Sequence, residues 1–274
     1  MPVSSRYHIL TGMLNHIYFL NLSLIDYERG SIMQILNLEK GLWFQMGKGQ
    51  NWRVAHPDMG AKQLTLNHSL HSPGHEFTQH THGETEDVFV ILEGGVSVRQ
   101  GEVYTPISAG DAVFIPSGEV HGTVNTTDSV ARLISFQSPP DMALYRGERD
   151  LSPDATPKPQ PGHKSAVQIT NMAKGGPVFG KPGNWRSVVS ADRGAEHIAL
   201  DYMQLGAGEG FQHEPGKTEE IYVIISGKAE VEADSRQWIL NAHDVIFLGP
   251  GDTFSLSQTG TEPITLIHCW AQDS

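Results

Sequence analysis

Cysteine, basic clusters and long hydrophobic runs are nearly absent from this sequence of 274 residues. Its single cysteine, Cys269, cannot form a disulfide within the chain, which favours a reducing compartment, and we expect a cytoplasmic protein. The formal net charge is −12 and lysine and arginine never form a run, so neither nucleic acid nor an anionic membrane is an expected partner. The apolar segment 14–25 is too short to span a bilayer and lacks the features of a signal peptide.

A sustained helical periodicity is missing as well. The apolar runs are short, rich in Val, Ile and Phe, and interrupted by turn residues, which 29 glycines and 16 prolines supply. Interruptions at about 8–12 residues are typical of all-β domains. The sequence therefore predicts a small β-barrel or jelly roll with a filled or ligand-holding interior.

The chain also repeats itself. Residues 33–41, MQILNLEKG, correspond to residues 167–175, VQITNMAKG, at an offset of 134. Farther along, TEDVFVILEG at 85–94 corresponds to TEEIYVIISG at 218–227, at an offset of 133. A repeat of this length predicts two homologous units, each folding as one barrel.

The repeat divides the chain into four segments. Residues 1–32 precede it and are either an N-terminal arm or the result of a start codon placed upstream of a true start at Met33. Residues 33–150 form the first unit, and residues 166–274 form the second unit. Residues 151–165 connect the units and are rich in proline, which predicts an extended linker.

The first unit contains two groups of residues whose spacing resembles the two sequence motifs of the cupin superfamily. The motifs are G-x5-H-x-H-x(3,4)-E-x6-G and G-x5-P-x-G-x2-H-x3-N. The matching residues are Gly74, His80, His82, an acid and Gly94, followed by Gly110, Pro116, Gly118, His121 and Asn125. With its internal repeat, the protein resembles a bicupin, which implies two tandem cupin barrels of the double-stranded β-helix type.

The spacing of these residues also has a chemical explanation. His80 and His82 stand two positions apart and point to the same face of a strand. A third imidazole from His121 and one carboxylate complete a set of three nitrogens and one oxygen. Such a set suits one divalent transition metal, Fe, Mn, Ni, Cu, Zn or Co, and leaves positions open for a substrate.

The carboxylate ligand is Asp87 or Glu86. Six residues separate Asp87 from Gly94, as the cupin motif requires, and the repeat pairs Asp87 with Glu220. Asp87 is one carbon shorter than the glutamate that is usual in the family. We favour Asp87 as the ligand and keep Glu86 as the alternative.

The second unit has lost part of this set. The offset of 133 places His213 and Glu220 at the positions of two ligands, but Pro215 stands where the first unit has His82, and Phe254 where it has His121. We therefore expect the second unit to bind no metal. His243 and His268 could form a different site, although His243 occupies the turn position of Gly110 and is expected to point outward.

Strand alternation suggests the walls of the substrate pocket. Asp87, Phe89 and Ile91 share one strand face, and we expect Phe89, Ile91 and Phe114 to line the pocket. His68 is a further candidate for the pocket as a group supporting the ligands or as a general base, although a single histidine is more often merely hydrogen-bonded or exposed. The sequence identifies no catalytic acid or base.

The resemblance implies chemistry on a small molecule: oxygen insertion, decarboxylation, isomerisation or a lyase reaction. The apolar lining favours a planar aromatic or enol substrate and hence a dioxygenase similar to the quercetinases. A metal-dependent isomerase, decarboxylase or lyase is one alternative, and a non-catalytic binding module is another. Cupins often pair through sheets or exchanged N-terminal strands, so a homodimer is the expected assembly, with a monomer as the alternative.

Overall fold

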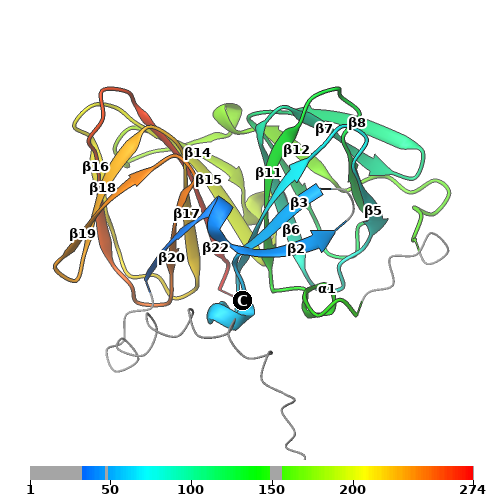
Figure 1. Ribbon diagram of the computed structural model, residues 1–274, viewed down its shortest axis with the longest axis horizontal. Coiled ribbons are helices and arrows are strands. Elements are labelled where there is room, and N and C mark those ends of the chain that lie inside the picture. The colour runs from blue at the N-terminus through cyan, green and yellow to red at the C-terminus, as the bar shows by residue number, and fades with distance from the viewer. Residues whose placement is uncertain (1–32, 47–48, 149–155, 274) are drawn as a thin grey trace, which may run out of the picture. The chain divides into compact units, whose positions relative to one another are not determined.

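The computed structural model describes residues 33–46, 49–148 and 156–273. Over these ranges the chain is nearly all β-strand and forms two barrels (Figure 1). The prediction of an all-β chain with two tandem barrels is confirmed. The arm predicted for residues 1–32, including its apolar segment 14–25, lies outside the described residues.

In the described part of the chain, each barrel consists of one seven-stranded and one four-stranded antiparallel sheet. The large sheet of the N-terminal barrel has the order β12 (Gln168–Asn171), β9 (Asp111–Ile115), β6 (Glu86–Glu93), β11 (Ala131–Ser138), β4 (Thr65–His71), β3 (Gly49–Ala55) and β2 (Leu42–Met46). Its small sheet has the order β5 (Glu76–His80), β10 (His121–Val124), β7 (Gly95–Gln100) and β8 (Val103–Ser108).

The C-terminal barrel repeats this arrangement. Its large sheet has the order β1 (Gln34–Asn37), β20 (Asp244–Leu248), β17 (Glu220–Ser226), β22 (Ile264–Ala271), β15 (Ile198–Leu205), β14 (Asn184–Val189) and β13 (Gly176–Val178). Its small sheet has the order β16 (Gly210–His213), β21 (Phe254–Gln258), β18 (Lys228–Ala233) and β19 (Arg236–Asn241).

The two repeats exchange their first strands. β1 begins the first repeat but pairs with β20 of the C-terminal barrel, where Figure 1 shows it in blue. β12 begins the second repeat but pairs with β9 of the N-terminal barrel. Each exchanged strand covers a sheet edge that would otherwise expose unpaired backbone groups. The sequence boundaries at 33 and 166 thus do not describe which strands share a sheet.

Three hydrophobic clusters hold this arrangement together. One fills the N-terminal barrel and includes Phe89 and Ile91. A second fills the C-terminal barrel and includes Tyr222 and Phe254. The third combines residues of both large sheets, so the barrels pack through a continuous apolar core that also buries Cys269.

One turn position distinguishes the repeats. Gly110 precedes β9 with a φ of +91°, and its counterpart His243 precedes β20 with a φ of +75°. Such values favour glycine, and histidine tolerates them better than most other residues. The ring of His243 lies 3.5 Å from the carboxylate of Glu39. The side chain of His243 is partly exposed.

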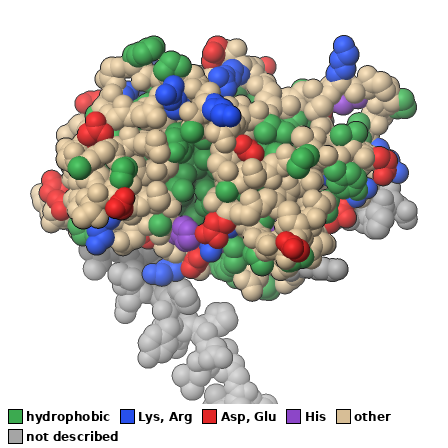
Figure 2. Space-filling model, turned by 90° about the horizontal axis from the view of Figure 1, so that it is seen from above, with side chains coloured by type: hydrophobic (Ala, Val, Ile, Leu, Met, Phe, Trp, Pro, Cys, Tyr) green, Lys and Arg blue, Asp and Glu red, His purple; other side chains and the backbone are tan. Residues whose placement is uncertain are grey.

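Helices are short in the described residues. The α-helix α1 spans Met142–Tyr145, and four 3₁₀ helices span Leu38–Lys40, Pro57–Met59, Met172–Lys174 and Ala191–Arg193. Residues 156–165, the described part of the predicted linker, contain neither helix nor strand. Among the described residues no helix is long and apolar enough to cross a membrane. On the face shown in Figure 2, acidic and basic side chains lie interspersed.

Candidate metal centre

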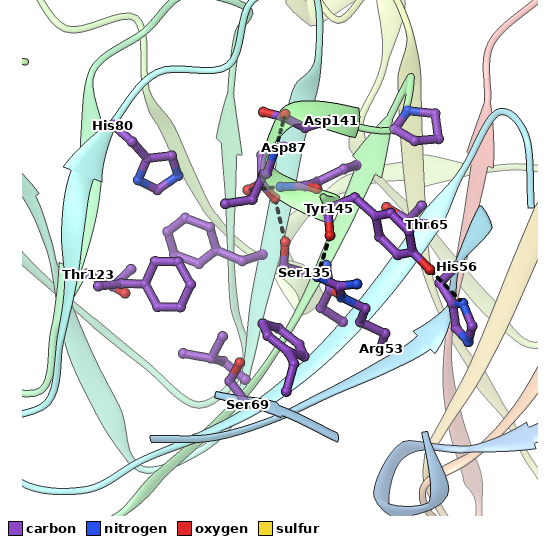
Figure 3. Close-up of a pocket in the computed structure, with 18 of the residues that line it drawn as sticks. Arg53, His56, Thr65, Ser69, His80, Asp87, Thr123, Ser135, Asp141 and Tyr145 are labelled. Carbon is purple, nitrogen blue, oxygen red and sulfur yellow. Dashed lines mark hydrogen bonds between the residues drawn. The ribbon is translucent and has the colours of Figure 1, made fainter. Parts of the chain in front are cut away.

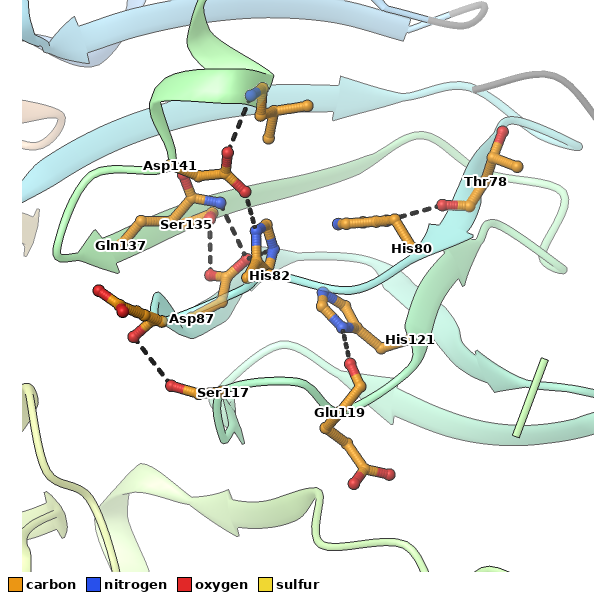
Figure 4. Close-up of polar contacts among 12 residues, drawn as sticks. Thr78, His80, His82, Asp87, Ser117, Glu119, His121, Ser135, Gln137 and Asp141 are labelled. Atoms are coloured by element: carbon orange, nitrogen blue, oxygen red, sulfur yellow. Dashed lines mark hydrogen bonds and ion pairs between the residues drawn. The ribbon is translucent and has the colours of Figure 1, made fainter. Parts of the chain in front are cut away.

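Three histidines meet inside the N-terminal barrel. His80 ends β5, His82 follows in the next loop, and His121 begins β10 directly opposite His80 (Figure 4). All three are buried, and one ligand atom from each lies within 4.8 Å of the others. The sequence spacing therefore brings these imidazoles together at one point.

Each imidazole is held by a hydrogen bond at Nδ1. The acceptor is the carbonyl of Thr78 for His80 (2.8 Å), the carboxylate of Asp141 for His82 (2.7 Å), and the carbonyl of Glu119 for His121 (3.0 Å). Because carbonyl and carboxylate oxygens only accept, Nδ1 carries the ring proton and Nε2 presents its lone pair. Metal-binding histidines in proteins are commonly oriented by such bonds.

Asp87 is the carboxylate next to this group. It accepts hydrogen bonds from Ser135 (2.8 Å) and Gln137 (3.3 Å), and its Oδ2 lies 3.5 Å from Nε2 of His82. Burial raises the pKa of Asp87, but the imidazoles of His82 and His121, in their protonated forms, and the hydroxyl of Ser135 outweigh it and lower the pKa overall. Asp87 is thus an ionised oxygen donor beside the imidazoles.

Glu86 points away from the histidines. Its carboxylate accepts hydrogen bonds from the backbone N–H groups of residues 196–198 in the C-terminal barrel, at 2.8–3.1 Å. Neighbouring residues of a strand face opposite sides, so β6 can present only one of Glu86 and Asp87 to the barrel interior. The geometry favours Asp87 as the carboxylate of the site.

The neutral state of the His121 imidazole suits a metal ligand. Burial lowers its pKa well below the ordinary value, and the neighbouring imidazoles of His80 and His82 lower the pKa further. A neutral imidazole is the form that binds a metal. Three such rings with one carboxylate form a donor set that fits a divalent transition metal.

A cavity opens beside these residues (Figure 3). His80, His121 and Asp87 form part of its wall. Its other lining is largely apolar and aromatic, with polar groups between: Phe44, Arg53, His56, Thr65, Asn67, Ser69, His71, Phe77, Phe89, Leu133, Ser135, Gln137, Asp141, Leu144 and Tyr145. This combination is typical of a pocket for a small molecule.

Of the pocket residues expected from the sequence, only Phe89 lines this cavity. Ile91 packs inside the barrel without reaching the cavity, and Phe114 belongs to the core between the barrels. In the β6–β9 pair, Phe114 lies opposite Val88, whereas Asp87 and Phe89 lie opposite Ile115 and Val113. Phe114 therefore occupies the strand face that points away from the site, and its assignment to the pocket is wrong.

His68 is also outside the cavity. On β4 the cavity is lined by Thr65, Asn67, Ser69 and His71, so His68 faces the opposite side. Its Nδ1 bonds the carbonyl of Leu38 (3.0 Å), and its ring stacks on Trp52 at 4.9 Å between centroids. His68 does share a face with Leu64 and Leu66, but that face packs in the core between the barrels.

Asp141 was not identified from the sequence, although it orients His82. It caps the N-terminus of α1, where its other oxygen accepts the N–H of Leu144 (2.8 Å). An aspartate before a helix is a recognisable capping signal. The contact with His82, 59 residues away, leaves no signal in the sequence.

The equivalent position in the C-terminal barrel is built differently. His213 lies opposite Phe254, as His80 lies opposite His121, and the two rings stack at 5.1 Å between centroids. Glu220 lies 2.6 Å from Nε2 of His268 and 3.7 Å from Nε2 of His213. The phenyl ring thus fills the place of the third imidazole. That this barrel binds no metal stays a prediction.

A family model described as "Cupin domain" matches residues 69–136. Over 122 residues the chain is 27% identical to the tetracenomycin polyketide synthase protein TcmJ of Streptomyces glaucescens, which covers 44% of this chain and 72% of TcmJ.

Solved structures match both barrels. Protein YlbA from E. coli superposes with a TM-score of 0.69 at 12% identity, over 88% of this chain and 92% of YlbA. A variant of oxalate decarboxylase OxdC from Bacillus subtilis superposes with a TM-score of 0.67 at 16% identity, over 87% of this chain and 77% of that one. Residues 69–136 thus match a cupin domain, and the chain shares the two-barrel fold of these structures.

Proposed function

We propose that the N-terminal barrel is a metal-dependent enzyme that acts on a small molecule bound in its cavity. One observation carries this proposal: three imidazoles oriented through Nδ1, with an ionised carboxylate beside them, border a cavity of suitable lining. His80, His82, His121 and Asp87 would hold one divalent metal. Elemental analysis of the purified protein would identify the metal among Fe, Mn, Ni, Cu, Zn and Co.

The chain's own residues set up this site. When bound, the metal supplies a Lewis acid and, if redox-active, a means of reacting with oxygen. Asp141 keeps His82 in the tautomer whose Nε2 faces inward, and Ser135 and Gln137 fix the carboxylate of Asp87. The apolar cavity walls exclude water from the substrate.

An oxygen-dependent reaction on a planar enol or aromatic substrate is the first candidate. Phe44, Phe77 and Phe89 give the cavity flat apolar faces. The relative TcmJ is named for a polyketide synthase, which agrees with such a substrate. A dioxygenase would insert oxygen into this substrate.

Decarboxylation is the second candidate. The cavity contains Arg53, whose charge suits a substrate carboxylate, and oxalate decarboxylase shares the two-barrel fold. In this reaction the substrate loses carbon dioxide without net oxidation. An isomerase or lyase reaction would use the same site, while a binding module would show affinity without turnover.

The test measures oxygen uptake and carbon dioxide release by the metal-loaded protein with flavonols, catechols, keto acids, sugar acids and oxalate. Oxygen uptake identifies a dioxygenase, and carbon dioxide release that persists under argon identifies a decarboxylase. The variant His121→Phe copies the residue that the C-terminal barrel uses at the same place, so it should fold but lose turnover. Binding without turnover across this panel would instead support the non-catalytic alternative.

A further inference from the structure

Arg53 is the basic residue that approaches the cavity from β3. Its guanidinium lies between two aromatic rings, 4.8 Å from the centroid of Phe44 and 4.0 Å from that of Tyr145. One N–H group donates to the carbonyl of Tyr145 at 2.7 Å. In Figure 3, Arg53 and Tyr145 lie across the cavity from His80. The rings and this bond fix the orientation of the guanidinium group.

Arg53 has no ion-pair partner within the part of the chain that the structure describes, whereas Arg99 pairs with Glu76 and Arg132 with Glu39. The nearby Asp58 accepts a hydrogen bond from the hydroxyl of Tyr145 instead. An arginine has five N–H donors, so Arg53 keeps donors for a ligand.

Two further side chains in the cavity wall lack hydrogen-bond partners among the described residues. Both ring nitrogens of His71 and the hydroxyl of Thr65 are buried without a hydrogen bond. His71 and Thr65 line the same cavity as Arg53. Buried polar groups nearly always find a partner, and a ligand that enters this cavity would supply it.

The two carboxylates of the cavity nearest the histidines are already engaged. Asp87 accepts hydrogen bonds from Ser135 and Gln137, and Asp141 accepts from His82 and from the N–H of Leu144. Neither carboxylate is therefore paired with the guanidinium of Arg53, which stays available to a ligand.

We propose that Arg53 binds the carboxylate of the substrate, and that the substrate is a small aromatic carboxylic acid. The planar guanidinium fork matches a planar carboxylate through two parallel hydrogen bonds. Phe44 and Tyr145 flank the fork and provide flat surfaces for an aromatic ring, while His71 and Thr65 bond polar substituents. This assignment of substrate class rests on the proposed function of the same cavity.

The test compares the binding of benzoate with that of benzamide, which has nearly the same shape and no charge. Titration calorimetry on the metal-loaded wild-type protein should show tighter binding of benzoate. In Arg53→Gln the affinity for benzoate should fall by about tenfold or more, as expected for loss of one charge-assisted pair, and that for benzamide should hardly change. Arg53→Lys, which keeps the charge, should retain part of the preference.

Arg99→Gln is the matched control. It removes one guanidinium from the same barrel, and this guanidinium also lies over an aromatic ring, Tyr104, at 5.4 Å. Because Arg99 is paired with Glu76 and does not line the cavity, its loss should leave benzoate binding unchanged. Circular dichroism and thermal unfolding of each variant show that the fold is kept.

The outcomes separate this proposal from the proposed function. Equal benzoate affinity in wild type and Arg53→Gln, or no benzoate binding by folded wild type at millimolar concentration, overturns the role of Arg53. If benzoate affinity is lost in His82→Ala but kept in Arg53→Gln, the carboxylate binds at the metal, and only the present proposal fails. A protein that takes up no metal but prefers benzoate through Arg53 keeps the anion site and contradicts the metal enzyme.

Discussion

Glu86 and Glu219 make the same contact in opposite directions across the two barrels. Glu86 accepts the backbone N–H groups of residues 196–198 at 2.8–3.1 Å, and Glu219 accepts those of residues 62–64 at 2.7–2.9 Å. The two glutamates correspond in the internal repeat. Each buried carboxylate thus holds a segment of the other barrel. This role explains why Glu86 stands next to Asp87 and Glu219 next to Glu220.

We predict that Glu86→Gln and Glu219→Gln each lower the free energy of unfolding. The amide keeps the shape but loses charge-assisted hydrogen bonds, which costs about 1–3 kcal/mol per site. Urea denaturation measures the change. Glu84→Gln, at an exposed position in the neighbouring loop, serves as the control and should change the stability little. Equal stability of all three variants and the wild type would contradict this role of Glu86 and Glu219.

The choice between Asp87 and Glu86 as ligand can be tested with the same amide substitutions. Asp87→Asn removes the ionised oxygen beside the histidines, so we expect the bound metal to be lost or greatly weakened. Glu86→Gln should keep its metal because that carboxylate faces the other barrel. Elemental analysis of the purified variants measures both. The reverse pattern would make Glu86 the ligand.

We predict about one metal equivalent per chain, in keeping with a single complete donor set. His80→Ala should abolish metal binding, whereas His213→Ala, the corresponding change in the C-terminal barrel, should leave the content unchanged. Plasma mass spectrometry of untagged protein measures the stoichiometry. A content near two equivalents would show that Glu220, His213 and His268 also bind a metal.

Asp141→Asn tests the orientation of His82. Asparagine caps helices as well as aspartate does, so α1 and the stability should be kept. If the amide oxygen keeps the N–H of Leu144, the NH₂ group faces Nδ1 of His82 and favours the tautomer whose Nε2 is protonated. We expect metal affinity to fall about 10- to 100-fold, as for other partners of metal-bound histidines. Competition with a chelating dye measures it, and unchanged affinity would refute the role of Asp141.

Stability should also depend on pH through His68. Burial lowers the pKa of His68 to about 4, and the charge of Arg132 contributes. In the unfolded chain the pKa is about 6.5, so the unfolded state takes up a proton first as the pH falls. Stability present above pH 6.5 is therefore lost progressively toward pH 4.

Urea denaturation at several pH values between 4 and 7 should show this loss. In His68→Gln the slope of unfolding free energy against pH should be smaller by about 1 kcal/mol per pH unit near pH 5. The slope is informative even if the variant is less stable at every pH. An identical slope in the variant and the wild type would assign the pH dependence to other groups.

The sequence alone determined the two β-barrels and the meeting of three histidines. Both follow from local rules: a repeat of fixed offset, turn residues between short apolar runs, and side chains that alternate along a strand. The same alternation separated Asp87 from Glu86. Turn signals and alternation depend on residues that are close in sequence, and the repeat and the motif spacing are visible by direct comparison of segments, so a pattern can show these properties.

The tertiary structure decided what alternation could not. Both faces of each large sheet are buried, one in a barrel and one between the barrels, so hydrophobicity does not tell which face is inside. For this reason Phe114 and His68 were placed in the pocket and belong elsewhere. The exchange of β1 and β12, the bond from His82 to Asp141 and the approach of Arg53 to the cavity join residues far apart in the chain, and only the packed fold brings them together.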